Sequence, residues 1–358
     1  MALKHEPLTR EEVKAAVRGE DGGGRPPAFM HKWPGEGLRE LHGDALQEVF
    51  DRYPDDVLGP GVVQPGSATD PEGFPEDYTW GFREAEQTTG PVARDAGGRV
   101  IRTWQDLDPF LEHLSRMGGM VRDGLPICHN VEEAVRRADG RYVLARAWNY
   151  FYERLWMLRG MQNLLMDFHL HPREVHRLCD GLLEFALELL ERAARAGADG
   201  FSSSNDLGHQ TGLMMGPGPF REFLKPRLAA LAEASHQRGM EFWLHSCGDL
   251  TDIVDDLAEI GVDCLHPIQY GAMDWAESAR RMNGRMTAWA GADVQHVLPE
   301  APPREVRRHV RRMIDTFYRP GAGRLVVAAG NGIIAPTTLE NIDAFLDECF
   351  RYGRQKAG

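Results

Sequence analysis

The sequence predicts a (β/α)8 TIM barrel, on three observations. From about residue 140 onward, short apolar runs alternate with long amphipathic stretches, which indicates parallel strands joined by right-handed helical crossovers. Several of the apolar runs end in polar or glycine-containing loops, as the strands of barrel enzymes do. A length of 358 residues is ordinary for one such barrel. We therefore expect a single domain over residues 1–358, with 1–140 as an N-terminal helical and loop extension and 141–358 as regular β/α units.

The expected strands are short apolar runs at residues 142–148, 200–203, 241–245, 264–266, 287–291 and 325–329. The expected helices follow them at 175–196, 219–238, 250–260, 275–282, 303–318 and 339–351. In the extension, Thr9 is placed to cap a helix that runs to Val17, and residues 28–30 read as the first strand. The stretch 50–100, rich in proline and glycine, is predicted to be a long loop beside the pocket.

A doubly wound nucleotide-binding sheet would also show this alternation, but no complete Gly-x-Gly-x-x-Gly motif follows a strand. The looser form at 330–335 follows the last strand, where no further βαβ unit remains. The barrel is therefore the better interpretation.

Charge and composition exclude several classes of function. A formal charge of −13 argues against a nucleic-acid partner, which requires clustered Lys and Arg. No apolar run approaches the roughly 20 residues that cross a bilayer, and the first residues lack the apolar core of a signal peptide. Five widely spaced cysteines indicate free thiols rather than a disulfide framework. These observations predict a cytoplasmic protein without a membrane or nucleic-acid partner.

The sequence His245-Ser246-Cys247-Gly248 ends one of the predicted strands. Because His245 and Cys247 flank one residue, their side chains can point the same way, and imidazole with thiolate suits Zn²⁺. His266 ends the next strand, about 4.8 Å away in a sheet, and is the expected further ligand. The alternative is that Cys247 is a packed thiol and His245 binds substrate without a metal.

Other polar residues lie near the predicted strand ends. Asp206 is a candidate general acid/base, although it can equally cap the following segment. His209, Gln269 and Asn331 are candidates for substrate binding, or for fixing their own loops. Trp80, in the long loop, is a candidate pocket residue, with core packing as the alternative.

The segments 243–249 and 261–269, with supporting stretches at 152–161, 205–210 and 337–341, resemble the uroporphyrinogen decarboxylase-like superfamily, which also contains corrinoid-linked methyltransferases. The resemblance implies a barrel with its site at the strand ends. The sequence departs from the family's pattern at two positions, and these restrict which reactions of the family can be expected. His31 stands where the decarboxylases have the first of the arginines that hold porphyrinogen carboxylates, and a titratable His cannot replace a bidentate guanidinium. Asn331 stands six residues before Thr337, where the methyltransferases have a zinc-binding Cys.

The resemblance favours a methyltransferase that moves a methyl group between a small molecule and a corrinoid (cobalamin) carrier, which would be a separate protein or a free cofactor. His245, Cys247 and His266 would bind zinc, Asp206 would handle the proton, and His31 would contact the substrate. The alternative is a metal-independent decarboxylase that acts on a small carboxylic acid. A non-catalytic binding protein on a barrel scaffold is the third interpretation.

Overall fold

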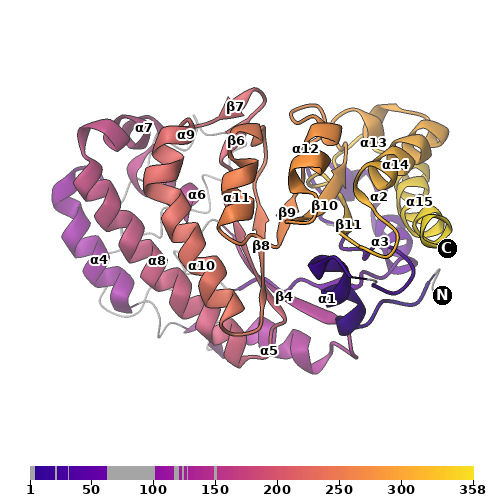
Figure 1. Ribbon diagram of the computed structural model, residues 1–358, viewed down its shortest axis with the longest axis horizontal. Coiled ribbons are helices and arrows are strands. Elements are labelled where there is room, and N and C mark those ends of the chain that lie inside the picture. The colour runs from indigo at the N-terminus through magenta and orange to yellow at the C-terminus, as the bar shows by residue number, and fades with distance from the viewer. Residues whose placement is uncertain are drawn as a thin grey trace.

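Seven parallel strands form the centre of the structure, a computed structural model that describes residues 5–20, 22–30, 32–62, 101–116, 121–122, 125–126, 128–148 and 151–358. Neighbouring strands are hydrogen-bonded in the order β1-β4-β5-β8-β9-β10-β11 and are parallel throughout. Helices surround this curled sheet (Figure 1). The strands are β1 (Val57–Leu58), β4 (Tyr142–Ala147), β5 (Gly200–Ser204), β8 (Glu241–His245), β9 (Cys264–His266), β10 (Thr287–Ala292) and β11 (Leu325–Ala329).

The segment at residues 28–30 closes the sheet into a barrel. Ala28 forms a parallel bridge with Val327 of β11, and the N–H of Ala329 donates to Met30 O at 3.0 Å. On the other side, the N–H of Asp56, just before β1, donates to Ala28 O at 2.8 Å. This segment thus occupies the eighth strand position, as an isolated bridge rather than a full strand. The predicted (β/α)8 barrel is confirmed.

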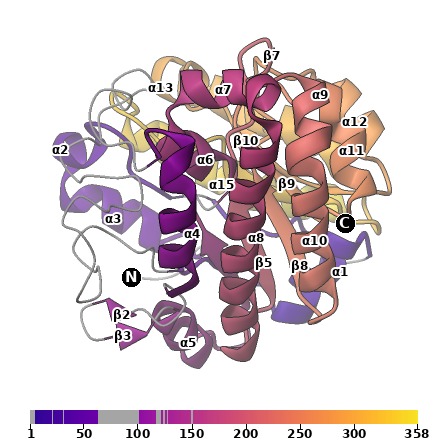
Figure 2. The ribbon, with the colours of Figure 1, turned by 90° about the vertical axis from the view of Figure 1, so that its left-hand side faces the viewer.

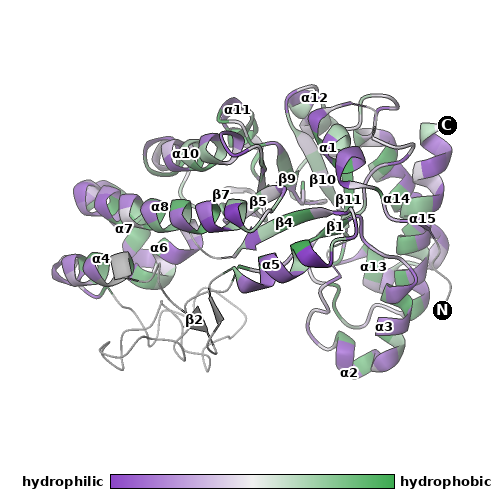
Figure 3. Cartoon of the chain, turned by 90° about the horizontal axis from the view of Figure 1, so that it is seen from below, coloured by the Kyte–Doolittle hydropathy of each residue, from purple (hydrophilic) through white to green (hydrophobic). Residues whose placement is uncertain are grey.

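The outer helices show both hydrophobic and hydrophilic residues (Figure 3). Helices α4, α8 and α10 pack side by side along one flank (Figure 2). The helices of the described part of the chain are α1 (Arg10–Arg18), α2 (Leu38–His42), α3 (Asp44–Asp51), α4 (Leu107–Arg116), α5 (His129–Arg136), α6 (Tyr152–Arg159), α7 (Met161–Leu170), α8 (Pro172–Arg195), α9 (Pro217–Pro219), α10 (Lys225–His236), α11 (Val254–Glu259), α12 (Trp275–Met282), α13 (Val297–Glu300), α14 (Pro303–Phe317) and α15 (Leu339–Ala357). Within these described residues, no helix combines the length and apolarity that spanning a membrane requires.

Two sequence-based expectations need refinement, and a third is confirmed. The helix expected at 219–238 is interrupted by a π-helical turn, Phe220–Leu224, before α10 begins. Strand β1 lies inside the stretch 50–100 that was expected to be loop. Residues 63–100, which hold the rest of that stretch, lie outside the described residues. The predicted cap of α1 is present, since Thr9 Oγ1 accepts the N–H of Glu12 and the Glu12 side chain returns to the N–H of Thr9.

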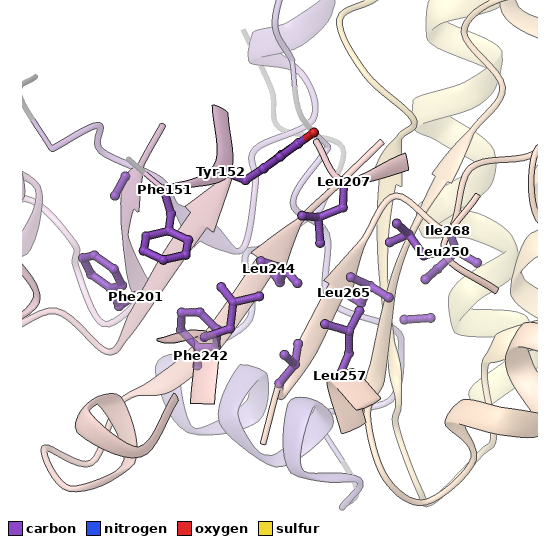
Figure 4. Close-up of a cluster of buried hydrophobic side chains, with 14 of the residues drawn as sticks. Phe151, Tyr152, Phe201, Leu207, Phe242, Leu244, Leu250, Leu257, Leu265 and Ile268 are labelled. Atoms are coloured by element: carbon purple, nitrogen blue, oxygen red, sulfur yellow. The ribbon is translucent and has the colours of Figure 1, made fainter. Parts of the chain in front are cut away.

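Two hydrophobic clusters hold the barrel together. The larger one fills the space between strands and helices, and part of it is drawn in Figure 4, where Phe201, Phe242 and Leu244 are labelled. The smaller cluster fills the inside of the barrel with alternate residues of the strands. Its members are Leu8, Val13, Val17, Phe29, Val57, Tyr142, Leu144, Trp243, Cys264, Trp289, Val326 and Ala328.

The two-residue period of a strand decides which polar side chains reach the interior. Tyr142 and Leu144 of β4 belong to the inner cluster, so Arg146 is the next inward residue of that strand. By the same alternation, the next inward residue after Trp243 of β8 is His245, and the next inward residue after Cys264 of β9 is His266. The carboxyl ends of three strands therefore present polar side chains above the apolar interior.

Candidate active site

The carboxyl ends of β8 and β9 bring two buried histidines together. His245 and His266 are register partners in the parallel pair, and their rings stack with centroids 4.9 Å apart. The Nδ1 atoms of the two rings lie 2.7 Å apart, and His266 Nε2 lies 3.0 Å from Ala329 O. The carbonyl of Ala329 and the imidazoles of His266 and His245 thus form one hydrogen-bonded row, which ends at Nε2 of His245.

This row fixes where the lone pair of His245 points. Ala329 O can only accept, so His266 Nε2 must carry a proton, which leaves Nδ1 of a neutral His266 as an acceptor. His245 Nδ1 then donates to it, and the remaining nitrogen of a neutral His245, Nε2, bears a lone pair. A histidine that binds a metal shows this arrangement, with its second nitrogen donating to a fixed acceptor.

The lone pair of His245 faces a thiol and a carboxylate. Nε2 lies 3.5 Å from Cys247 Sγ and 3.4 Å from Asp206 Oδ1. The ligand atoms of Asp206, His245 and Cys247 all lie within 4.8 Å of one another. Three lone-pair-bearing atoms at such distances repel one another unless a cation, either a proton or a metal ion, lies between them.

The pKa values of the carboxyl and the thiol reflect this crowding. Burial raises the pKa of Asp206, but the hydrogen bond and charge of a protonated His245, together with the N–H of Cys247 at 3.0 Å, lower it below its usual value. Burial, followed by the negative charges of Asp206 and Glu153, raises the pKa of the Cys247 thiol well above its usual value. Without a metal, Cys247 is therefore a protonated thiol at neutral pH.

Two amide side chains hold the loops of this cluster. Asn331 Oδ1 accepts the N–H of Gly332 at 2.7 Å, so its amide nitrogen faces Cys247 Sγ, at 3.3 Å. Asn331 thus donates to the sulfur and does not offer a ligand oxygen. Gln269 Oε1 accepts the N–H of Gly248 at 2.7 Å and fixes the turn after Cys247.

Two cavities open beside the cluster. The main cavity, of about 770 Å³, is bordered by His245 and Asp206, and a second cavity of about 660 Å³ is bordered by Cys247. His245 and Cys247 therefore border two different cavities, which share Trp33 and Asn331 as lining residues.

The model of the uroporphyrinogen decarboxylase (URO-D) family matches residues 155–352. The chain belongs to this family. No curated protein matches the sequence. Among solved structures, this URO-D family member is similar to a methyltransferase from Methanosarcina mazei, at 15% identity over 97% of this chain and 99% of the other, with a TM-score of 0.64. A B12-independent methionine synthase from Shewanella sp. W3-18-1 matches at 14% identity over 63% of this chain and 65% of its own, with a TM-score of 0.40. At 15% identity, the likeness to the Methanosarcina mazei methyltransferase concerns the fold alone.

Not every residue expected in the site of this URO-D family member is found there. His31 and Trp80 lie outside the described residues. His209 lies exposed on the β6–β7 hairpin (residues 208–213) and borders the second cavity, away from the histidine row. His266 was expected to be a metal ligand, but both of its ring nitrogens are engaged, and Asp206 takes its place in the cluster.

Four charged residues that line the main cavity were missed as site residues: Lys32, Asp55, Arg146 and Glu153. Glu153 accepts from Ser204 Oγ at 3.0 Å beside the cavity. Arg146 was read only as part of a buried strand. The signal for it was available, because a charge in the middle of an apolar strand is costly unless something uses it.

Proposed function

We propose that this protein is a zinc-assisted methyltransferase that moves a methyl group between a small molecule and a corrinoid carrier, supplied by another protein or as a free cofactor. The observation that carries the proposal is the convergence of Asp206, His245 and Cys247, with the lone pair of His245 aimed into the cluster by a backbone carbonyl. Membership of the URO-D family and the similarity in fold to a methyltransferase support it.

The donor set fits zinc. Carboxylate oxygen, imidazole nitrogen and thiolate sulfur are its three common ligand types, and three protein ligands leave the fourth position open, as in catalytic zinc sites. Asp206, His245 and Cys247 would hold the ion, which would lower the pKa of a bound thiol or water and so supply a nucleophile at neutral pH. Asn331 does not fill the role of the cysteine that the resemblance implies as third ligand, because its amide nitrogen faces the sulfur.

The surrounding residues position this cluster. His266 holds the ring of His245, and the amide of Asn331 stabilises negative charge on Cys247 Sγ by donating to it. Asp206 borders the main cavity and can take or return a proton there. The main cavity would receive the small molecule.

A metal-independent decarboxylase of a small carboxylic acid is the second candidate. The observation that favours it is the 3.4 Å approach of His245 Nε2 to Asp206 Oδ1 at the edge of the main cavity. A protonated His245 held by this carboxylate would be a proton donor for a carbanion, without any metal.

Metal analysis separates the two candidates. After zinc titration and gel filtration, the wild type is expected to retain one zinc per chain, and Cys247→Ala is expected to lose it. Cys264→Ala is the matched control, since this thiol is buried inside the barrel on β9, away from the cluster. Corrinoid turnover is then followed by the absorbance of methylcobalamin in the presence of candidate acceptors. A wild type that binds no zinc and releases CO₂ from carboxylic acids would refute the methyltransferase.

A further inference from the structure

Arg146 is a cation at the edge of the main cavity, and no carboxylate of the described residues forms an ion pair with it. Its Nε donates to Gly59 O at 2.7 Å, and its side chain lines the cavity. In the part of the chain that the structure describes, no Asp or Glu oxygen lies within ion-pair distance of it. Among the described residues, neither terminal nitrogen of the guanidinium has a hydrogen-bond partner, so both can donate to a bound ligand.

Lys32, the other cation of the same cavity, provides the contrast. Its ammonium lies 3.4 Å from Asp55 Oδ2 and also contacts the backbone oxygens of Phe50 and Tyr53. Burial lowers the pKa of Arg146 to about 10, although the charge of Asp55 raises it, so the guanidinium is still charged at neutral pH. A buried charge without a counterion is unfavourable, and a bound anion would remove that cost.

Aromatic rings hold the guanidinium in place. Its central carbon lies 5.6 Å from the ring centre of Phe29 and 5.3 Å from that of Trp148. Gly59 must lack a side chain here, because a Cβ atom would lie 2.9 Å from Arg146 Nε and 2.3 Å from Phe29 Cζ. The fork of Arg146 is therefore fixed before any ligand arrives, which suits two parallel hydrogen bonds to a planar anion.

The surroundings restrict the anion further. Asp55, Glu153 and Asp206 also line the cavity, and their negative charges disfavour a dianion such as phosphate relative to a singly charged carboxylate. Phe29, Trp33 and Trp148 supply apolar walls for a flat body. The ring of Trp148 meets that of His245 edge-on at 5.4 Å, which connects the Arg146 side of the cavity to the metal-binding cluster.

We infer that Arg146 binds the carboxylate of a small, planar substrate whose other end reaches His245 and Asp206. The inference rests on the proposed function only in placing the reaction at that cluster; binding of the carboxylate itself needs no turnover.

Isothermal titration calorimetry with benzoate, its neutral isostere benzamide and inorganic phosphate tests this on the full chain. The wild type is expected to bind benzoate at least about 10-fold more tightly than benzamide or phosphate, as hydrogen bonds to a charged group imply. Equal affinity for benzoate and benzamide, or tighter binding of phosphate, would overturn the inference. This comparison needs no variant and so does not depend on the folding of one.

Variants test whether the preference for benzoate depends on Arg146. Arg146→Met is expected to weaken benzoate binding about 10- to 100-fold and leave benzamide binding unchanged, whereas Arg146→Lys, which lacks the fork, falls between. Arg137→Gln removes the same charge from the exposed residue that follows α5 and is expected to change nothing. Benzoate preference retained in a folded Arg146→Met would refute the assignment. Cys247→Ala is expected to keep the preference while losing zinc, so a chain that prefers benzoate but binds no zinc would contradict only the methyltransferase.

Discussion

Three neighbouring strands, β5, β8 and β9, carry charged or polar groups at both ends, and the two ends differ in how these groups are satisfied. At the amino ends stand Asp199, Glu241 and Asp263, and at or just beyond the carboxyl ends stand Asp206, His245 and His266. The first three are matched by cations and backbone donors. The others converge on one another beside a cavity.

The amino-end carboxylates each have partners elsewhere in the fold. Asp199 lies 3.0 Å from Lys14 Nζ and accepts the N–H of Val143 at 3.0 Å. Glu241 accepts from Arg18 at 2.7 Å and from the hydroxyl of Tyr142 at 2.8 Å. Helix α1 supplies two of these cations, so it both covers this end of the barrel and neutralises it.

The carboxyl ends carry one carboxylate, Asp206, and two histidines, His245 and His266. Asp206 accepts the N–H of Cys247 and lies 3.4 Å from His245 Nε2. Among the described residues, no Lys or Arg forms an ion pair with this carboxylate. Polar groups at the amino end of a barrel stabilise it, and those at the carboxyl end act on ligands. We therefore expect substitutions at the carboxyl ends to lower turnover and leave stability unchanged. Substitutions at the amino ends are expected to lower stability and leave turnover unchanged.

Asp206→Asn is expected to have the largest effect, a fall in kcat of about 10²- to 10⁴-fold, because the group that handles the proton is lost. The amide oxygen can still accept the N–H of Cys247, so the free energy of unfolding is expected to stay within about 0.5 kcal/mol of the wild type. Steady-state kinetics and urea unfolding measure the two quantities. An Asn variant with full activity would remove Asp206 from the reaction.

His266→Phe keeps an aromatic ring beside His245 and Trp289 but removes both nitrogens of the row. His245 then loses the acceptor that fixes its tautomer, and zinc affinity is expected to fall about 10- to 100-fold. Competition with a chromophoric chelator measures the affinity. Cys264→Ala, two residues earlier on β9, serves as the control with unchanged affinity. Unaltered zinc binding in His266→Phe would show that the row does not orient His245.

Asp199→Ala tests the opposite end. It leaves the N–H of Val143 without its acceptor and Lys14 without its counterion, so the free energy of unfolding is expected to fall by about 2 kcal/mol. Urea unfolding measures this loss, and turnover at 25 °C is expected to be unchanged. An Asp199→Ala variant with wild-type stability but reduced turnover would contradict the stabilising role of the amino ends.

His236 should give the smallest effect, and it depends on pH. Its hydrogen bond to Asp263, at 2.7 Å, and the charge of that carboxylate raise the pKa of His236 although burial lowers it. A raised pKa in the folded state stabilises the protein below the unfolded pKa of 6.5, and the contribution is lost as pH rises through the folded value.

Because the imidazole is 43% exposed, solvent screening limits this contribution to about 0.5 kcal/mol. His236→Gln is therefore expected to be less stable than the wild type by this amount at pH 5.5 and equal to it at pH 9. A difference in the free energy of unfolding between the wild type and His236→Gln that grows as pH rises would contradict this prediction.

Much of the fold follows from the sequence alone. The alternation of apolar runs and amphipathic stretches locates β4, β5, β8, β9, β10 and β11 within one or two residues, because each strand needs a buried apolar run between two turns. Of the two N-terminal strand positions, residues 28–30 were predicted, and Ala28 pairs with Val327 of β11. Residues 57–58 were missed, because two residues paired with β4 are too few to form a pattern in the sequence.

For the candidate site, the sequence by itself determined that His245 and Cys247 lie at a strand end and share a direction, because the strand period governs both. Only the tertiary structure decided the rest. Asp206 joins the cluster where His266 was expected, and Arg146 meets Gly59, which is 87 residues away. Which side chains meet across strands depends on the stagger of the barrel and the course of its loops, and the periodicity of a single strand contains neither.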